Sequence, residues 1–160
     1  MYRSPTCTPA DKAAAESLAK IAGVDVEAYA NEMFLAGSNL RNKTEEEIFF
    51  QDFKKFSSDD VTFGVSQITS LNEGELKMIG TRLKPCLEQF RVNQHVDMVF
   101  FMLTDIVKES TNLLYAGEEV EGILEALYGR VGVEGTIELP GVVSRKKQLV
   151  PALIQTIQQL

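Results

Sequence analysis

The chain of 160 residues contains no tryptophan, a single histidine and only two cysteines. With His95 as the only histidine, an HExxH zinc motif, a histidine cluster and a Ser-His-Asp triad are all excluded. We interpret His95 as a residue at the boundary between a helix and a strand. Cys7 and Cys86 lie far apart without CxxC spacing, which disfavours a zinc site. We therefore expect a reduced, cytoplasmic protein.

Long apolar runs and an excess of basic charge are also missing. No window is long and apolar enough to span a bilayer, and the first residues lack the apolar core of a signal peptide. The chain has 16 basic and 23 acidic residues, a net charge of -7. This balance argues against a nucleic-acid or anionic-membrane surface, so any anion site must be local. The sequence has no glycine-rich phosphate loop and no metal-loop spacing of carboxylates.

The patterns that are present indicate the fold class. The length suits one domain. Helix-capping residues at Thr8, Asp25 and Thr44 predict three helices first, after which strand and helix patterns alternate. We therefore predict an α/β domain whose small mixed β-sheet is covered by helices on both faces, preceded by an N-terminal helical segment.

Local patterns predict several elements in more detail. Alternation at 61–66 indicates a half-buried strand, and the apolar run at 96–103 indicates a central strand covered on both faces. Pro85 should kink the long helix that begins near residue 72. We expect Asp97 and Asp105 to mark the solvent-facing ends of the central strand.

The two ends of the chain carry further expectations. The first helix should bury Ala14, Leu18 and Ile21 at helical spacing. The strand at 136–139 is interpreted as reaching through a Pro-Gly turn as far as Val142 and Val143. Because Pro151 suits an early helical position, we expect the last helix to begin near Lys147.

Three adjacent cations, Arg145, Lys146 and Lys147, follow the helix-capping residue Ser144. A helix start has free backbone N–H groups, so cations placed there favour a phosphate ligand. The alternative, which a charge run by itself favours, is a solvated basic corner. An arginine beside a lysine suits phosphoryl oxygens better than a single carboxylate does. No residue pattern in the chain predicts groups that could activate water or hold a pair of metal ions to cleave a phosphate.

A second basic place is the loop that contains Lys43 and Arg41. Long cationic side chains in loops are mostly solvated surface, and this is the ordinary interpretation of Lys43. Apart from the cations at 145–147, this loop is the only place in the sequence that we consider a candidate for an anion contact.

The stretch from Gly141 to Gln148, with the Val-Pro pair at 150–151, resembles the C-terminal signature of manganese-dependent (family II) inorganic pyrophosphatases. Residues 4–8 resemble the junction between the two domains of these enzymes. Weaker similarities at 22–25, 36–40 and 103–106 follow in the family's order. The resemblance covers essentially the whole chain and identifies it as the C-terminal DHH-associated domain. It implies that residues 1–7 are a remnant of the junction with a catalytic DHH domain and that 8–160 form the substrate-binding domain.

The resemblance also implies residue roles. Arg145 and Lys146 would bind pyrophosphate oxygens, with Lys43 as a third contact and Ser144 and Lys147 in support. Manganese would be bound by the absent N-terminal domain, so no catalytic residue and no metal ligand is expected in this chain. The chain alone would be an inactive monomer, whose partners are pyrophosphate and that N-terminal domain, with no nucleic acid and no membrane.

Two other functions stay open at this point. One is the second domain of an exopolyphosphatase-like or Prune-like DHH phosphoesterase. The other is a freestanding, non-catalytic phosphate-binding module.

Overall fold

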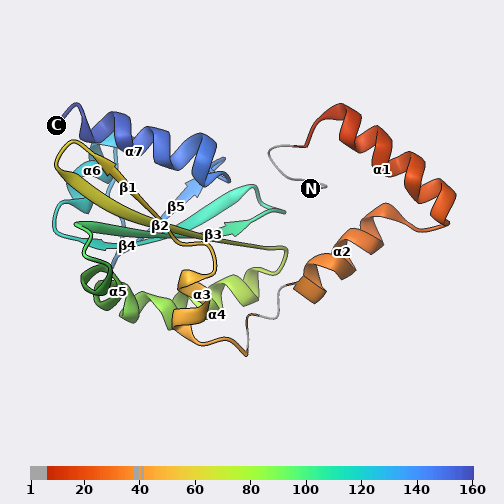
Figure 1. The fold of residues 1–160 in the computed structure, drawn as a ribbon, viewed down its shortest axis with the longest axis horizontal. Helices are drawn as coiled ribbons and strands as arrows, with labels where there is room; N and C mark the ends of the chain where they lie inside the picture. The colour runs from red at the N-terminus through yellow and green to blue at the C-terminus, as the bar shows by residue number, and fades with distance from the viewer. Residues whose placement is uncertain (1–6, 38–39, 41) are drawn as a thin grey trace.

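A five-stranded β-sheet lies between two layers of helices in the computed structural model, which describes residues 7–37, 40 and 42–160 (Figure 1). In chain order the elements are α1 (Pro9–Ala22), α2 (Val26–Gly37), α3 (Glu45–Phe50), β1 (Lys54–Ser58), β2 (Val61–Ser70), α4 (Glu73–Leu83), η1 (Lys84–Cys86), α5 (Leu87–Gln94), β3 (Met98–Asp105), β4 (Ser110–Gly117), α6 (Val120–Tyr128), β5 (Thr136–Pro140), η2 (Arg145–Leu149) and α7 (Val150–Ile157). The predicted fold class is confirmed.

The sheet is mixed, and its strands follow the order β1-β2-β3-β4-β5. Only β2 and β3 run parallel, whereas the other neighbours are antiparallel. A parallel pair requires a long crossover, and here α4, η1 and α5 supply it. Pro85 lies in the 3-10 turn η1 and separates α4 from α5, so the predicted kink is confirmed.

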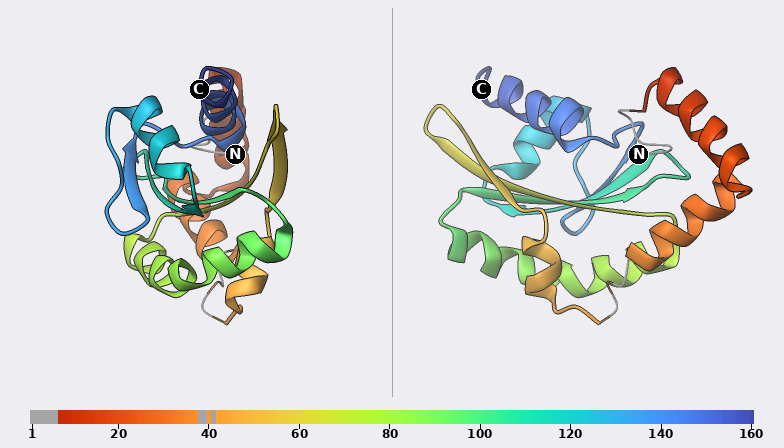
Figure 2. Two further views of the ribbon diagram at one scale, coloured as in Figure 1. Left: turned by 90° about the vertical axis from the view of Figure 1, so that its left-hand side faces the viewer. Right: turned by 45° about the vertical axis from the view of Figure 1, so that its right-hand side comes forward.

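The central strand β3 is buried along its whole length and supplies both cores. Successive side chains of a strand point to opposite faces. Phe100 lies in the core that contains residues of α6 and α7, and its neighbour Phe101 lies in the core that contains residues of α3, α4 and α5. Figure 2 shows these two helical layers on opposite sides of the sheet. The prediction of a strand covered on both faces is confirmed.

The first two helices extend away from the sheet (Figures 1 and 2). The prediction that Ala14, Leu18 and Ile21 are buried is wrong. Leu18 is 65% exposed and Ile21 is 84% exposed, and Ala19 is the only residue of α1 that is buried. An apolar stripe at helical spacing shows which face could be covered, but burial requires a second element. In α2, Tyr29 and Met33 are also exposed.

Asp105 differs from the expectation of a solvent-facing strand end. It is only 8% exposed, and its Oδ1 accepts hydrogen bonds from the backbone N–H groups of Val107 and Lys108. The side chain therefore stabilises the turn between β3 and β4. Asp97 is exposed, as predicted, and its carboxylate accepts from the backbone and hydroxyl of Thr62.

Two expectations near the C-terminus are also wrong. Val142 and Val143 do not extend β5, which ends at Pro140 before Gly141 turns the chain with φ +76°. The helical turn η2 begins at Arg145 rather than near Lys147, because Ser144 is its N-cap. None of the helices in the described part of the chain combines the length and the apolar character needed to cross a bilayer.

Candidate anion-binding site

The segment 141–148 is held in place by Gln148, a residue of η2 that reaches back along the chain. Its Oε1 accepts hydrogen bonds of 2.9 Å from the backbone N–H groups of Val143 and Ser144, and its Nε2 donates to the carbonyl of Gly141. The Ser144 hydroxyl accepts from the backbone N–H of Lys147. These contacts satisfy donors that a helix start otherwise leaves free. The segment therefore has a defined conformation before any ligand binds.

A chain of polar side chains beneath this segment ties it to the sheet. Gln67 of β2 donates to Thr104 of β3, whose hydroxyl lies 2.9 Å from that of Thr111 of β4. Thr111 donates to the carbonyl of Val142, and Gln67 donates to that of Val143. Thr104 and Thr111 are buried. We call Gln67, Thr104 and Thr111 the polar bridge. No sequence pattern predicts the polar bridge, since nothing local shows that three strands present these groups together.

Arg145 turns its side chain inward rather than into solvent. The side chain is 11% exposed and forms an ion pair with Asp52, with 3.0 Å between Nη2 and Oδ1. Its Nη1 donates to the backbone carbonyls of Asp52 and Val65. The backbone N–H of Arg145 donates to Oε1 of Gln67, so the polar bridge also contacts this residue. A solvated basic corner does not describe Arg145.

Lys146 and Lys147 are exposed, and their side chains have no partner among the residues that the structure describes. The backbone amides of Arg145 and Lys147 are already bound to Gln67 and Ser144. The sequence hypothesis relied on free helix N–H groups, but these two are taken. Anion binding here would therefore depend mainly on the cationic side chains.

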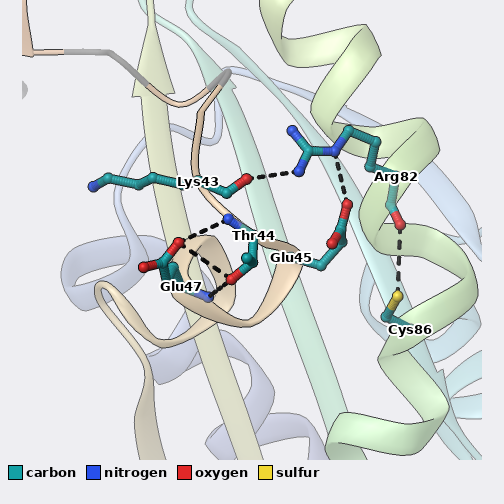
Figure 3. A network of polar contacts seen from close by, with 6 residues as sticks. All are labelled: Lys43, Thr44, Glu45, Glu47, Arg82 and Cys86. Carbon is teal, nitrogen blue, oxygen red and sulfur yellow. Dashed lines mark hydrogen bonds and ion pairs between the residues drawn. The ribbon is translucent and has the colours of Figure 1, made fainter.

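The backbone of Lys43 is anchored to α4 by Arg82 (Figure 3). Nη2 of Arg82 donates to the carbonyl of Lys43 at 2.7 Å, and its Nε donates to Glu45 at 2.8 Å. Thr44 and Glu47 form the predicted capping box at the start of α3. Hydrogen bonds from the Thr44 backbone, and next from its hydroxyl, lower the pKa of Glu47. Figure 3 shows the Lys43 side chain pointing away from Arg82.

The side chains of Lys43 and Arg145 converge on two consecutive residues. Nζ of Lys43 donates to Oε1 of Gln51 at 2.7 Å, and Arg145 binds the next residue, Asp52. Consecutive Cα atoms lie only about 3.8 Å apart. Each of the two basic places singled out in the sequence is thus bound to the connection between α3 and β1. Arg41, the other cation of that loop, lies outside the described residues, as do residues 1–6 of the expected junction.

The residues that the structure describes do not fit a manganese site. Among the described residues, no three His, Cys, Asp or Glu side chains gather where they could hold a metal ion. His95 ends α5 in a left-handed conformation with φ +52°, which confirms its interpretation as a boundary residue.

The comparisons with known proteins agree on one family. The model of the DHHA2 domain matches residues 31–156. A cobalt-dependent inorganic pyrophosphatase of Clostridium perfringens is 41% identical over 158 residues, which is 98% of this chain and 28% of that protein. A manganese-dependent inorganic pyrophosphatase of Methanothrix thermoacetophila is 37% identical over 96% of this chain and 50% of its own length.

A solved structure shows the same fold. The crystal structure of a Methanococcus jannaschii protein, described as a family II inorganic pyrophosphatase, superposes with a TM-score of 0.82 at 32% identity. The match covers 98% of this chain and 51% of that one. The chain thus spans about half the length, or less, of these relatives.

Proposed function

The chain belongs to the DHHA2 domain family, and we propose that it is the substrate-binding part of a metal-dependent inorganic pyrophosphatase. In that enzyme, water and pyrophosphate would yield two phosphates. Arg145, Lys146 and Lys43 would bind pyrophosphate, and Ser144 and Lys147 would support them. Residues 144–147 are here called the basic corner.

One observation carries this proposal. Lys43 and Arg145 are held by the consecutive residues Gln51 and Asp52, and the exposed Lys146 follows Arg145 directly. A planar guanidinium offers paired N–H groups that match two phosphoryl oxygens, whereas an ammonium acts as a compact point charge. This combination suits a small polyanion with several oxygens. The names of the relatives, which are pyrophosphatases, support the same ligand.

The roles of the cations follow from charge. Pyrophosphate hydrolysis builds negative charge on the departing phosphate, and fixed cations that face this charge lower the barrier. Arg145 and Lys146 would hold the oxygens of one phosphoryl group, and Lys43 would add a third positive charge. Ser144 supports the start of η2 as its cap, and Lys147 strengthens the local field. These residues bind and neutralise, and none of them is placed to activate water.

The chemistry of cleavage would reside in another part of a longer protein. The described residues contain no metal-ligand group, and the relatives are about twice this length or more. The exposed Leu18, Ile21, Tyr29 and Met33 on α1 and α2 support contact between this segment and that other part. We therefore propose a catalytic DHH domain as the partner and place the manganese there. The free thiols of Cys7 and Cys86 support a cytoplasmic location.

Calorimetric titration of the 160-residue chain with pyrophosphate tests the binding role. We expect binding that weakens about 10-fold or more in Arg145→Gln and in Lys43→Met, because each change removes a charge-assisted contact. Lys20→Met, which removes an exposed cation on α1, is the matched control. Absence of binding by the unchanged chain at millimolar pyrophosphate would contradict the proposal. Equal losses in all three variants would show a nonspecific charge effect instead.

Two further measurements test the proposed division of labour. With manganese and pyrophosphate, the purified chain should release no phosphate above background, and robust turnover would contradict a purely binding role. Light scattering at micromolar concentration should give the mass of a monomer. A stable dimer would contradict that expectation and would point to the exposed residues of α1 and α2 as the contact.

A further inference from the structure

The guanidinium of Arg145 is only partly used by the protein. An arginine side chain has five N–H donors. Three of them are engaged: both on Nη1, which face the carbonyls of Asp52 and Val65, and one on Nη2, which faces the Asp52 carboxylate. The Nε–H and the second N–H of Nη2 have no partner among the described residues. These two donors are neighbours on one edge of the planar group.

We propose that Asp52 is a positioning residue, which holds Arg145 by one edge so that its Nε–Nη2 edge is presented to a pair of phosphoryl oxygens. This inference deepens the proposed function and rests on it. It assigns to Asp52 a role in substrate binding without contact between Asp52 and the substrate.

Two opposing effects of Asp52 have to be weighed. Its negative charge partly cancels the positive potential at the site and, by that effect alone, weakens anion binding. Against this, an arginine side chain loses considerable rotamer entropy when it is ordered, and Asp52 orders it before the ligand arrives. The negative charge of Asp52 offsets mainly the charge of Arg145, and the positive charges of Lys43, Lys146 and Lys147 remain. We therefore propose that ordering of Arg145 by Asp52 raises the affinity for the anion more than the charge of Asp52 lowers it.

The environment of the pair supports an ordering role. Arg145 is 11% exposed, whereas Asp52 is 46% exposed. The arginine is thus enclosed and the carboxylate is partly hydrated, so the pair is not an isolated buried ion pair with a large desolvation cost. The backbone carbonyl of the same residue, Asp52, accepts a second hydrogen bond from the guanidinium. Two acceptors from one residue fix the orientation of the plane as well as its position.

The variants Asp52→Ala and Asp52→Asn test the proposal, and Asp60→Ala is the matched control. Asp60 is an exposed carboxylate in the turn between β1 and β2, so its removal changes net charge equally. Asparagine keeps an acceptor oxygen of the same shape and should rescue part of the effect. A cooperative urea denaturation transition would confirm that each variant is folded.

The first measurement needs no ligand. The Nε–H signal of Arg145, assigned by its loss in Arg145→Lys, reports the mobility of the side chain through its 15N heteronuclear NOE. We expect a rigid signal in the unchanged chain and in Asp60→Ala, a mobile one in Asp52→Ala and an intermediate one in Asp52→Asn. A signal that stays equally rigid in Asp52→Ala would overturn the proposal.

The second measurement is the affinity for pyrophosphate. Whether the affinity rises or falls in Asp52→Ala decides between the two effects. Loss of a negative charge alone should strengthen anion binding, as we expect for Asp60→Ala to a small degree. Loss of positioning should weaken binding by about three- to tenfold in Asp52→Ala. Stronger binding in that variant would overturn the proposal. If the unchanged chain fails to bind, the proposed function fails, while the mobility measurement still decides the role of Asp52.

Discussion

Arg145 and Asp52 meet across 93 positions of the chain, and a few buried polar side chains make that meeting reproducible. The polar bridge spans three strands and binds two carbonyls of the segment that precedes η2. Buried hydrogen bonds contribute modestly when made, but an unpaired buried group is costly. The position of Arg145 therefore depends on residues that would never contact a ligand.

Thr111→Val tests the polar bridge. Thr111 is fully buried, and valine removes its hydroxyl while keeping its shape. The Val142 carbonyl and the Thr104 hydroxyl each lose a partner, so we expect the free energy of unfolding to fall by about 1–3 kcal/mol. Urea denaturation measures it. Thr136→Val in β5 should change it by less than about 0.5 kcal/mol, because the Thr136 hydroxyl has no hydrogen-bond partner among the described residues. Equal effects would contradict a special role for Thr111.

Arg82→Met tests the anchor of Lys43. Methionine keeps an apolar stem but removes the hydrogen bonds to the Lys43 carbonyl and to Glu45. Because Arg82 is 28% exposed, we expect a loss of about 1–2 kcal/mol in unfolding free energy. Lys77→Met is the control, since the pair of Lys77 with Glu73 is far more exposed and its loss should change the unfolding free energy less. A neutral Arg82→Met would show that the loop needs no anchor.

At the scale of elements, the end of β4 approaches the backbone just before β3 very closely. Gly117, the last residue of β4, has φ +136°, and a Cβ there would lie 2.5 Å from the backbone carbonyl of Asp97. Backbone atoms cannot move aside as a flexible side chain can. The antiparallel register of β3 and β4 therefore requires glycine at this position.

Gly117→Ala should lower the unfolding free energy by about 2–4 kcal/mol, since it combines an unfavourable φ with a clash. The matched variant is Gly122→Ala in α6, where a Cβ would meet nothing within 4 Å. Alanine is the better helix former, so that variant should gain about 0.5–1 kcal/mol. Thermal and urea denaturation measure both. A tolerated Gly117→Ala would contradict the register observed at this end of the sheet.

At the scale of the whole molecule, the carboxylates whose pKa values shift are all shifted downward. Hydrogen bonds from Lys108, and then from Lys77, lower the pKa of Glu73 from 4.5 to about 2. Hydrogen bonds from the Thr62 backbone lower that of Asp97. A carboxylate with a lowered pKa in the folded state stabilises the fold above its unfolded pKa. The stabilisation is lost as pH falls through the folded value.

The midpoint of thermal unfolding should therefore fall as pH drops from about 4.5 towards 2. Glu73→Gln removes the carboxylate whose pKa is lowered to about 2, so the unfolding midpoint of this variant should depend less steeply on pH in this window. Calorimetry at pH 7, 4.5 and 3 compares the two proteins. Parallel curves would show that Glu73 does not contribute. Added salt should reduce the difference, because Glu73 and its lysine partners are solvent-exposed.

The sequence by itself determined whatever depends on neighbours within a few residues. The helix caps at Thr8 and Thr44 and the kink at Pro85 follow from local hydrogen bonding and residue spacing, and all are present. The buried strand, expected at 96–103, is found at 98–105. The fold class follows from their order. The basic corner and Lys43 were also singled out, although their roles stay a proposal.

Which groups contact one another could be seen only in the folded chain. No local pattern indicates that Asp52 holds Arg145, or that Gln67, Thr104 and Thr111 form one bridge. Local sequence patterns also do not show that Leu18 is exposed while Asp105 is buried. The physical reason is the same in each case. Burial and long-range polar contacts depend on the partner that another element supplies, and that partner is set by the packing of the whole chain.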